Sequence, residues 1–186
     1  MELNKFIKYY DLINPKSVSK LIKFINTVEY KEAPTIGGLN KDIRNVEEYN
    51  LHPNNKKSLT NVKWYNTLKF YITQAVELYK QDSYKLINEK PDPRSIEVIN
   101  ILKYKENYFY KKHVDHHHAV PRTLSVIIFL NNDYKGGDLF FHFGEEKLKI
   151  KPNVGRILIW PSNFQYPHQV EPVSEGTRYV VVSWLL

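Results

Sequence analysis

Three residues with metal-binding side chains stand at spacings that could assemble one site. His113 and Asp115 are separated by a single residue, and His168 follows much later in the chain. On an extended segment, alternate residues project to the same face, so the imidazole of His113 and the carboxylate of Asp115 could meet one ion. Two imidazoles and one carboxylate form the facial ligand set that binds non-haem Fe(II) and leaves coordination positions open. The pattern predicts a metal centre with room for reactants.

A cationic residue follows the second histidine where its charge needs a partner. Arg178 comes just after Gly176-Thr177, at the start of an apolar strand that we predict over 179–185. A guanidinium that points into a barrel interior is costly unless it is paired with an anion. We therefore expect the planar donor fork of Arg178 to bind a carboxylate of a co-substrate.

The competing interpretation of the histidines is an ordinary surface loop. A His-x-Asp pair arises by chance in many chains, and His113 is followed closely by His116, His117 and His118. Those three histidines could hydrogen-bond the metal ligands from behind, or they could face solvent, and we expect solvent.

Composition limits the chemistry that is available. The chain has 186 residues and no cysteine, which excludes disulfides, thiolate metal sites and cysteine nucleophiles. Any metal must therefore bind His, Asp or Glu, which suit Fe(II), Mn(II) or Zn(II). The sequence shows neither a secretory signal pattern nor an apolar run long enough to span a membrane. We expect a cytoplasmic protein without membrane partners.

The formal net charge of +7 could indicate an anionic partner. The lysines are scattered, however, and no recognised nucleic-acid-binding signature accompanies them. We therefore expect solvated surface charge and no nucleic-acid partner.

The first half of the chain predicts mainly helical structure that supports the second half. Asn14-Pro15 begins a helix that ends near Thr27, and Thr60 or Asn61 caps a second helix of about twenty residues. Between them, residues 34–60 are polar and rich in turn residues, so we expect a long loop and a candidate lid over a substrate.

The pattern changes from residue 95 onward to short strands separated by Gly, Pro and Asn turns. The predicted strands lie at 96–104, 124–130, 139–143, 147–150, 156–160 and 179–185. Consecutive short strands without intervening helices favour an antiparallel sandwich or barrel. We predict one α+β domain over 1–186, in which N-terminal helices (1–94) pack on one sheet of a double-stranded β-helix, or jelly roll (95–186).

The stretch from Tyr104 to Trp184 resembles the prolyl 4-hydroxylase-like branch of the Fe(II)/2-oxoglutarate-dependent dioxygenases. The resemblance rests on an ordered series of residues with the family's spacings: Tyr104, Tyr110, His113-Val-Asp115, Arg122, Leu130-Asn131, Gly136-Gly137, Pro152-Asn-Val-Gly155, His168, Pro172-Val173, Gly176-Thr-Arg178 and Trp184. The first hundred residues carry no match of this kind.

The resemblance implies a role for each matched side chain. It assigns Fe(II) to His113, Asp115 and His168, the distal carboxylate of 2-oxoglutarate to Arg178, and a further co-substrate hydrogen bond to Tyr104. It assigns contact with a substrate proline to Tyr110, Arg122 and Trp184, although Trp184 could equally pack in the core. The implied partners are O₂, 2-oxoglutarate and a protein or peptide substrate, with ascorbate as an additional cofactor that the family allows.

The chain departs from the family pattern at several places. Phe129 stands where many relatives have a tyrosine, which removes one hydroxyl that could bind 2-oxoglutarate, and we expect Arg178 to compensate with Ser125 or Thr123. Lys105-Glu106-Asn107 lacks the usual glycine.

Three functions remain open from the sequence. The first is hydroxylation of a peptidyl proline. The second is a related dioxygenase reaction on another residue, a small molecule or a nucleobase. The third is a non-catalytic jelly-roll binding module, which the joint presence of all three metal ligands and Arg178 disfavours.

Overall fold

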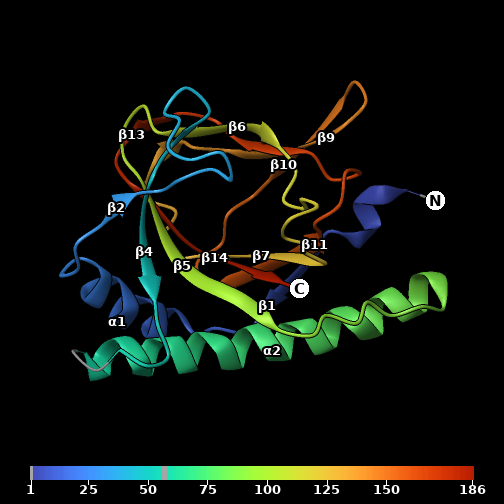
Figure 1. Cartoon of the computed structure of the whole chain (residues 1–186), viewed down its shortest axis with the longest axis horizontal. Helices are drawn as coiled ribbons and strands as arrows, with labels where there is room; N and C mark the ends of the chain where they lie inside the picture. Colours follow the sequence, from blue (N-terminus) through green and yellow to red (C-terminus); the bar gives the residue numbers. More distant parts are fainter. Residues whose placement is uncertain (1, 56–57) are drawn as a thin grey trace.

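The computed structural model describes residues 2–55 and 58–186 and consists of two antiparallel sheets that face each other (Figure 1). The larger sheet contains, in spatial order, β1 (Lys8–Asp11), β11 (Arg156–Pro161), β7 (Leu124–Phe129), β14 (Arg178–Leu185), β5 (Ile96–Tyr104), β4 (Glu47–Leu51) and β2 (Lys31–Glu32). The smaller sheet contains β10 (Glu146–Ile150), β9 (Leu139–Phe143), β12 (His168–Val170), β6 (Phe109–His113) and β3 (Arg44–Asn45). A separate pair joins β13 (Val173–Glu175) to β8 (Lys135–Gly136).

The central strands of the larger sheet are buried on both faces, which explains their nearly continuous apolar sequences. In β7, Val126 and Ile128 pack toward the helices, whereas Ile127 and Phe129 pack into the space between the sheets. The alternation in β14 is the same, and it places Val180 and Val182 between the sheets. Arg178 has the same parity as these two valines, so the strand directs its side chain into the interior.

Two helices cover the outer face of the larger sheet, along the lower side of Figure 1, and a short 3-10 helix η1 (Leu3–Phe6) precedes β1. Helix α1 (Pro15–Ile25) begins where the side chain of Asn14 accepts a hydrogen bond from Lys16 N, with Pro15 at the first helical position. Helix α2 (Leu59–Ile87) buries an apolar stripe against the strands. The predicted jelly roll with helices packed on one sheet is confirmed. That the chain forms a single domain stays a prediction.

The prediction of a mainly helical first half is wrong in part, because this half also supplies strands to both sheets. β1 pairs with β11, β4 pairs with β5, and β3 pairs with β6. The prediction of one long loop over 34–60 is wrong for the same reason, since β3 and β4 lie within it. These strands are short and partly exposed, and β4 is polar in sequence. Their sequences therefore show no alternating apolar pattern, and only backbone pairing makes them strands.

The second helix also differs from the prediction at both ends. It runs for 29 residues, and its N-cap is Ser58, whose side chain accepts a hydrogen bond from Asn61 N. Asn61 lies inside the helix and is fully buried: its Oδ1 accepts from His52 N, and its Nδ2 donates to the Tyr49 hydroxyl. Asn61 therefore ties the helix to β4 and the residue after it and does not cap the helix.

Candidate metal centre

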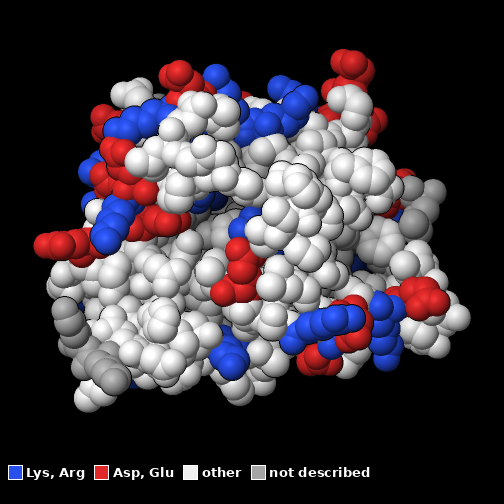
Figure 2. Space-filling view, in the orientation of Figure 1, with Lys and Arg blue, Asp and Glu red and all other residues white. Residues whose placement is uncertain are grey.

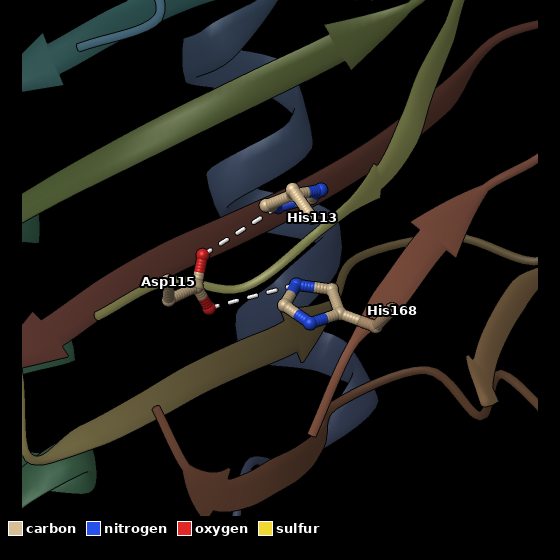
Figure 3. Close-up of side chains that lie close together, drawn as sticks. All are labelled: His113, Asp115 and His168. Carbon is tan, nitrogen blue, oxygen red and sulfur yellow. Dashed lines mark ion pairs between the residues drawn. The ribbon is translucent and has the colours of Figure 1, made fainter. Parts of the chain in front are cut away.

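The fold brings His113, Asp115 and His168 together between the two sheets. His113 ends β6, His168 begins β12, and the two residues are direct cross-strand partners. Asp115 lies in the turn after β6. One ligand atom from each residue lies within 4.8 Å of the others, and Figure 3 shows the carboxylate of Asp115 beside the two imidazoles, with one oxygen directed to each ring. The predicted meeting of these three side chains is confirmed.

Backbone carbonyls hold both imidazoles in the orientation that a metal requires. His113 Nδ1 lies 2.8 Å from Lys111 O, and His168 Nδ1 lies 3.0 Å from Tyr166 O. Because a carbonyl only accepts, each Nδ1 carries the proton, and each Nε2 keeps a free lone pair. Both Nε2 atoms lie 3.5 Å from an oxygen of Asp115. The three groups thus direct their donor atoms to one point.

The charge states of Asp115 and His168, which are both buried, also suit the binding of a cation. Burial raises the pKa of Asp115, but the nearby His168 and His113 and a hydrogen bond from Ser125 outweigh it, and the pKa lies below the usual range. Burial lowers the pKa of His168, against the opposing charge of Asp115. An ionised carboxylate and a neutral imidazole are the forms that bind a metal.

Arg178 is a buried cation without an anionic partner among the described residues. Its side chain is 1% exposed, and none of its three guanidinium nitrogens has a hydrogen-bond acceptor among the described residues. The guanidinium carbon lies 4.9 Å from the ring centroid of Tyr104, which is also buried. Burial raises the pKa of Tyr104, although the charge of Arg178 opposes this rise. An unpaired buried guanidinium is stable only if an anion joins it, so this end of the interior is suited to a carboxylate.

A cavity between the sheets adjoins the three candidate ligands. Its wall is mostly apolar, and it is lined by Arg44, Leu102, Tyr104, Tyr110, His113, Asp115, Val126, Ile127, Leu139, Trp160, His168, Val170, Val182 and Trp184. A dianionic keto acid that chelates a cation and extends a second carboxylate would match this donor set: cation-binding groups at one place and an unpaired guanidinium at another. The residues present therefore fit Fe(II) and 2-oxoglutarate.

Comparison with known proteins agrees with this geometry. Residues 99–186 match the profile of the 2OG-Fe(II) oxygenase superfamily. This part of the chain belongs to that superfamily. Similar curated proteins include PKHD-type hydroxylases of Prochlorococcus marinus (35% identical over 97 residues) and Crocosphaera subtropica (33% over 100 residues). Each match covers 50% of this chain, and the chain spans 43% and 44% of the length of these relatives.

Solved structures extend the similarity over almost the whole fold. A prolyl hydroxylase of Trichoplax adhaerens, in complex with a peptide fragment of hypoxia inducible factor, aligns with a TM-score of 0.77 at 16% identity, over 98% of this chain and 84% of its own. A prolyl-4-hydroxylase of Pseudomonas putida aligns with a TM-score of 0.68 at 15% identity, over 96% and 91%. At these identities the likeness shows the fold alone.

The three residues that resemble the substrate contacts of the superfamily's prolyl hydroxylases lie at one opening beside the metal ligands. Tyr110 stacks on His113 with ring centroids 3.6 Å apart, and the guanidinium of Arg122 lies 3.9 Å from the Trp184 ring centroid. A second hollow, of about 230 Å³, opens beside them, and we call it the mouth; it is lined by Pro34, Thr35, Ile36, Arg44, Glu48, Glu97, Val98, Asn100, Tyr110, Val114, Asp115, Arg122 and Trp184.

The structure also shows where Ser125 and the three neighbouring histidines lie. Ser125 does not contact Arg178: its hydroxyl donates to Asp115 Oδ2 and lies beside the hydroxyl of Ser162. His116 and His118 are exposed, as expected, whereas His117 is only partly exposed. Nδ1 of His116 lies 3.0 Å from Arg122 O.

Sequence reasoning missed Ser162, Glu97 and Arg44 near the site. Only the last carried a usable signal, since a lone arginine in a polar segment that was expected to cover a substrate is a candidate contact. No helix within the described ranges has the length and apolar character to cross a bilayer.

Proposed function

We propose that this protein is an Fe(II)- and 2-oxoglutarate-dependent dioxygenase that hydroxylates peptidyl proline. The observation that carries the proposal is the unpaired guanidinium of Arg178, buried in the same interior as a His-Asp-His cluster. A metal-binding module alone would have no use for a desolvated cation. A reaction that needs a second carboxylate anchored away from the metal supplies the missing anion.

The chain's own residues divide the binding tasks. His113, Asp115 and His168 would hold Fe(II), Arg178 would pair with the distal carboxylate of 2-oxoglutarate, and the hydroxyl of Tyr104 would donate a hydrogen bond to the same co-substrate. Fe(II) with 2-oxoglutarate and O₂ supplies the oxidation that places one oxygen atom on a substrate C–H bond and the other in succinate, with release of CO₂. Ascorbate would serve as an accessory reductant.

Apolar side chains would keep water away from the reacting atoms. Leu102, Ile127, Leu139 and Val182 line the cavity beside the ligands, and all are buried. A dry cavity strengthens the ion pairs inside it and protects reactive species from water. Pro34, Thr35 and Ile36 line the mouth, which supports our proposal that part of the segment 34–60 acts as a lid over bound substrate.

The choice of a peptidyl proline draws on both the mouth and the relatives. Tyr110, Arg122 and Trp184 line the mouth and match the superfamily residues that contact proline. Both structural neighbours described above are named prolyl hydroxylases, and one of them was solved with a peptide bound. The peptide substrate and a cytoplasmic location remain predictions.

Succinate formation from 2-oxoglutarate tests the proposal. We expect the wild-type protein with Fe(II) to form succinate, and proline-containing peptides to gain one oxygen atom on proline by mass spectrometry. His113→Ala and Asp115→Ala should abolish both, whereas His118→Ala, which removes an exposed histidine from the same loop, should not. Unchanged turnover in either ligand variant would reject the metal assignment, and oxygen found only on other residues or molecules would reject proline.

A further inference from the structure

Both cations that line the mouth have an acidic partner. Arg122 donates to Glu97 through two parallel bonds, Nε to Oε2 at 2.7 Å and NH2 to Oε1 at 2.8 Å. Arg44 lies 4.0 Å from a carboxylate oxygen of Glu48. Figure 2 shows basic and acidic side chains side by side near the centre of this face, next to a recess. The two arginines therefore add no net charge to the mouth.

The ion pair with Glu97 balances the charge of Arg122 but leaves some of its N–H groups available as hydrogen-bond donors. A guanidinium has five N–H groups. Glu97 takes one from Nε and one from NH2, and Asp115 O lies 3.4 Å from NH1, a third, weaker contact. The remaining N–H groups have no other acceptor among the bonds of the described residues. Because the guanidinium also lies over the Trp184 ring, with its carbon 3.9 Å from the ring centroid, Glu97 and Trp184 together hold these donors at the mouth.

Arg178 and Arg122 differ in the kind of group that each can bind. Arg178 is buried and unpaired, so it attracts an anion strongly. Arg122 is neutralised, so an anion beside it would also meet the carboxylate of Glu97, and the repulsion would cancel the attraction. A neutral carbonyl oxygen, by contrast, can accept a hydrogen bond from the paired guanidinium at no such cost.

We propose that Glu97 determines substrate specificity by neutralising Arg122, so that the mouth accepts a neutral amide carbonyl and rejects a free carboxylate. The substrate is then a proline whose carbonyl belongs to a peptide bond, not a free amino acid or a C-terminal proline. The inference rests on the proposed prolyl substrate and goes beyond it, because it names the group that is recognised and the residue that sets the preference.

Two ligands that differ only in charge test this inference. N-Acetyl-L-proline amide and N-acetyl-L-proline share the ring and differ in whether the terminal group is an amide or a carboxylate. Their dissociation constants are measured by ligand-observed NMR on protein loaded with Mn(II) and saturating 2-oxoglutarate, so that Arg178 is already occupied and no turnover occurs. We expect the wild type to bind the amide roughly tenfold more tightly than the carboxylate.

Variants at Glu97 connect this preference to the ion pair. Glu97→Gln leaves Arg122 charged, so affinity for N-acetyl-L-proline should rise until the preference disappears or reverses, whereas Glu97→Asp keeps the charge and should keep the preference. Circular dichroism controls for folding, and the wild-type ratio decides the matter if Glu97→Gln does not fold.

A wild type that binds the carboxylate as tightly as the amide would overturn the inference, as would a Glu97→Gln variant that gains no affinity for the carboxylate. The second result counts even if the wild type binds neither ligand, because an unpaired Arg122 must attract an anion. Succinate formation in the same preparations reports on the dioxygenase function separately.

Discussion

Ser125 donates a hydrogen bond of 2.6 Å to Oδ2 of Asp115. Its single proton is used there, so Ser162, whose Oγ lies 2.7 Å away, must donate to Ser125 in turn. Both serines are 1% exposed. A buried chain of two hydroxyls thus fixes the carboxylate that faces the imidazoles of His113 and His168, and such chains strengthen each bond within them.

Ser125→Ala should weaken metal binding without removing a ligand. The variant loses the bond that orients the Asp115 carboxylate and leaves Ser162 without an acceptor. Losses of outer hydrogen bonds to metal ligands typically cost about 10- to 100-fold in affinity. Titration calorimetry with Mn(II) under anaerobic conditions would measure the change directly, independently of turnover.

Ser183→Ala is the matched control for this prediction. Ser183 is also fully buried and also donates one hydrogen bond, in its case to Val98 O, and it does not line the cavity. Its loss should lower the free energy of unfolding by about 1 kcal/mol and leave the affinity for Mn(II) unchanged. If the two variants weaken Mn(II) binding equally, the effect is a general loss of packing and the role of Ser125 is refuted.

Arg178→Met should stabilise the protein alone and abolish its response to 2-oxoglutarate. Burial of an unpaired guanidinium costs free energy that a methionine of similar length does not. We expect the free energy of unfolding to rise by about 1 kcal/mol or more in the absence of ligands. In thermal unfolding with Mn(II) present, 2-oxoglutarate should raise the Tm of the wild type but not that of the variant.

Arg156→Met gives the comparison for a paired arginine. Arg156 forms two bonds with Asp11 at the surface, where such pairs contribute less than about 1 kcal/mol. This variant should be equal to the wild type or slightly less stable and should keep the full response to 2-oxoglutarate. An Arg178→Met variant that is strongly destabilised would mean that Arg178 already has a partner in the protein alone.

The sequence was informative where one residue's chemistry requires a particular environment. A His-x-Asp pair and a distant histidine could be picked out before the fold was known because their order and spacing match the superfamily pattern, and the arginine at the start of an apolar strand because its burial is costly without an anion. Apolar runs bounded by turn residues likewise located the buried strands, such as 124–130 and 179–185. These signals are local, and they survive without knowledge of the partner strands.

Features that depend on pairing between distant segments could not be predicted. Glu97 meets Arg122 only because β5 and the loop before β7 lie side by side in this fold. Ser125 looked available to bind 2-oxoglutarate until the structure placed Ser162 and Asp115 beside it. The polar sequence of β4 predicts a loop, whereas backbone pairing with β5, not its side chains, makes it a strand.

The start of α2 offers a direct test of one such correction. Ser58→Ala removes the side chain that accepts from Asn61 N, and loss of an N-cap of this kind costs about 1 kcal/mol. Thr60, one of the two caps that the sequence predicts, lies exposed inside the first turn, so Thr60→Ala should change stability by less than about 0.5 kcal/mol. Urea unfolding followed by circular dichroism would measure both, and a larger loss for Thr60→Ala would contradict the cap assignment.

Gly155 joins the segment before α1 to the jelly roll, and Gly155→Ala should disrupt that junction. Gly155 has φ +85°, and a Cβ there would lie 2.3 Å from Ile13 O. Backbone must therefore move, in addition to the left-handed strain of about 1 kcal/mol that any alanine would carry.

Gly144→Ala separates these two costs. Gly144 has φ +64° with nothing near its absent Cβ, so that variant should lose about 1 kcal/mol from strain alone. Gly155→Ala should lose roughly 3 kcal/mol or more in urea unfolding, because the clash with Ile13 adds to the strain. Equal losses in the two variants would show that the backbone around Ile13 yields freely, and that the N-terminal segment packs loosely against the jelly roll.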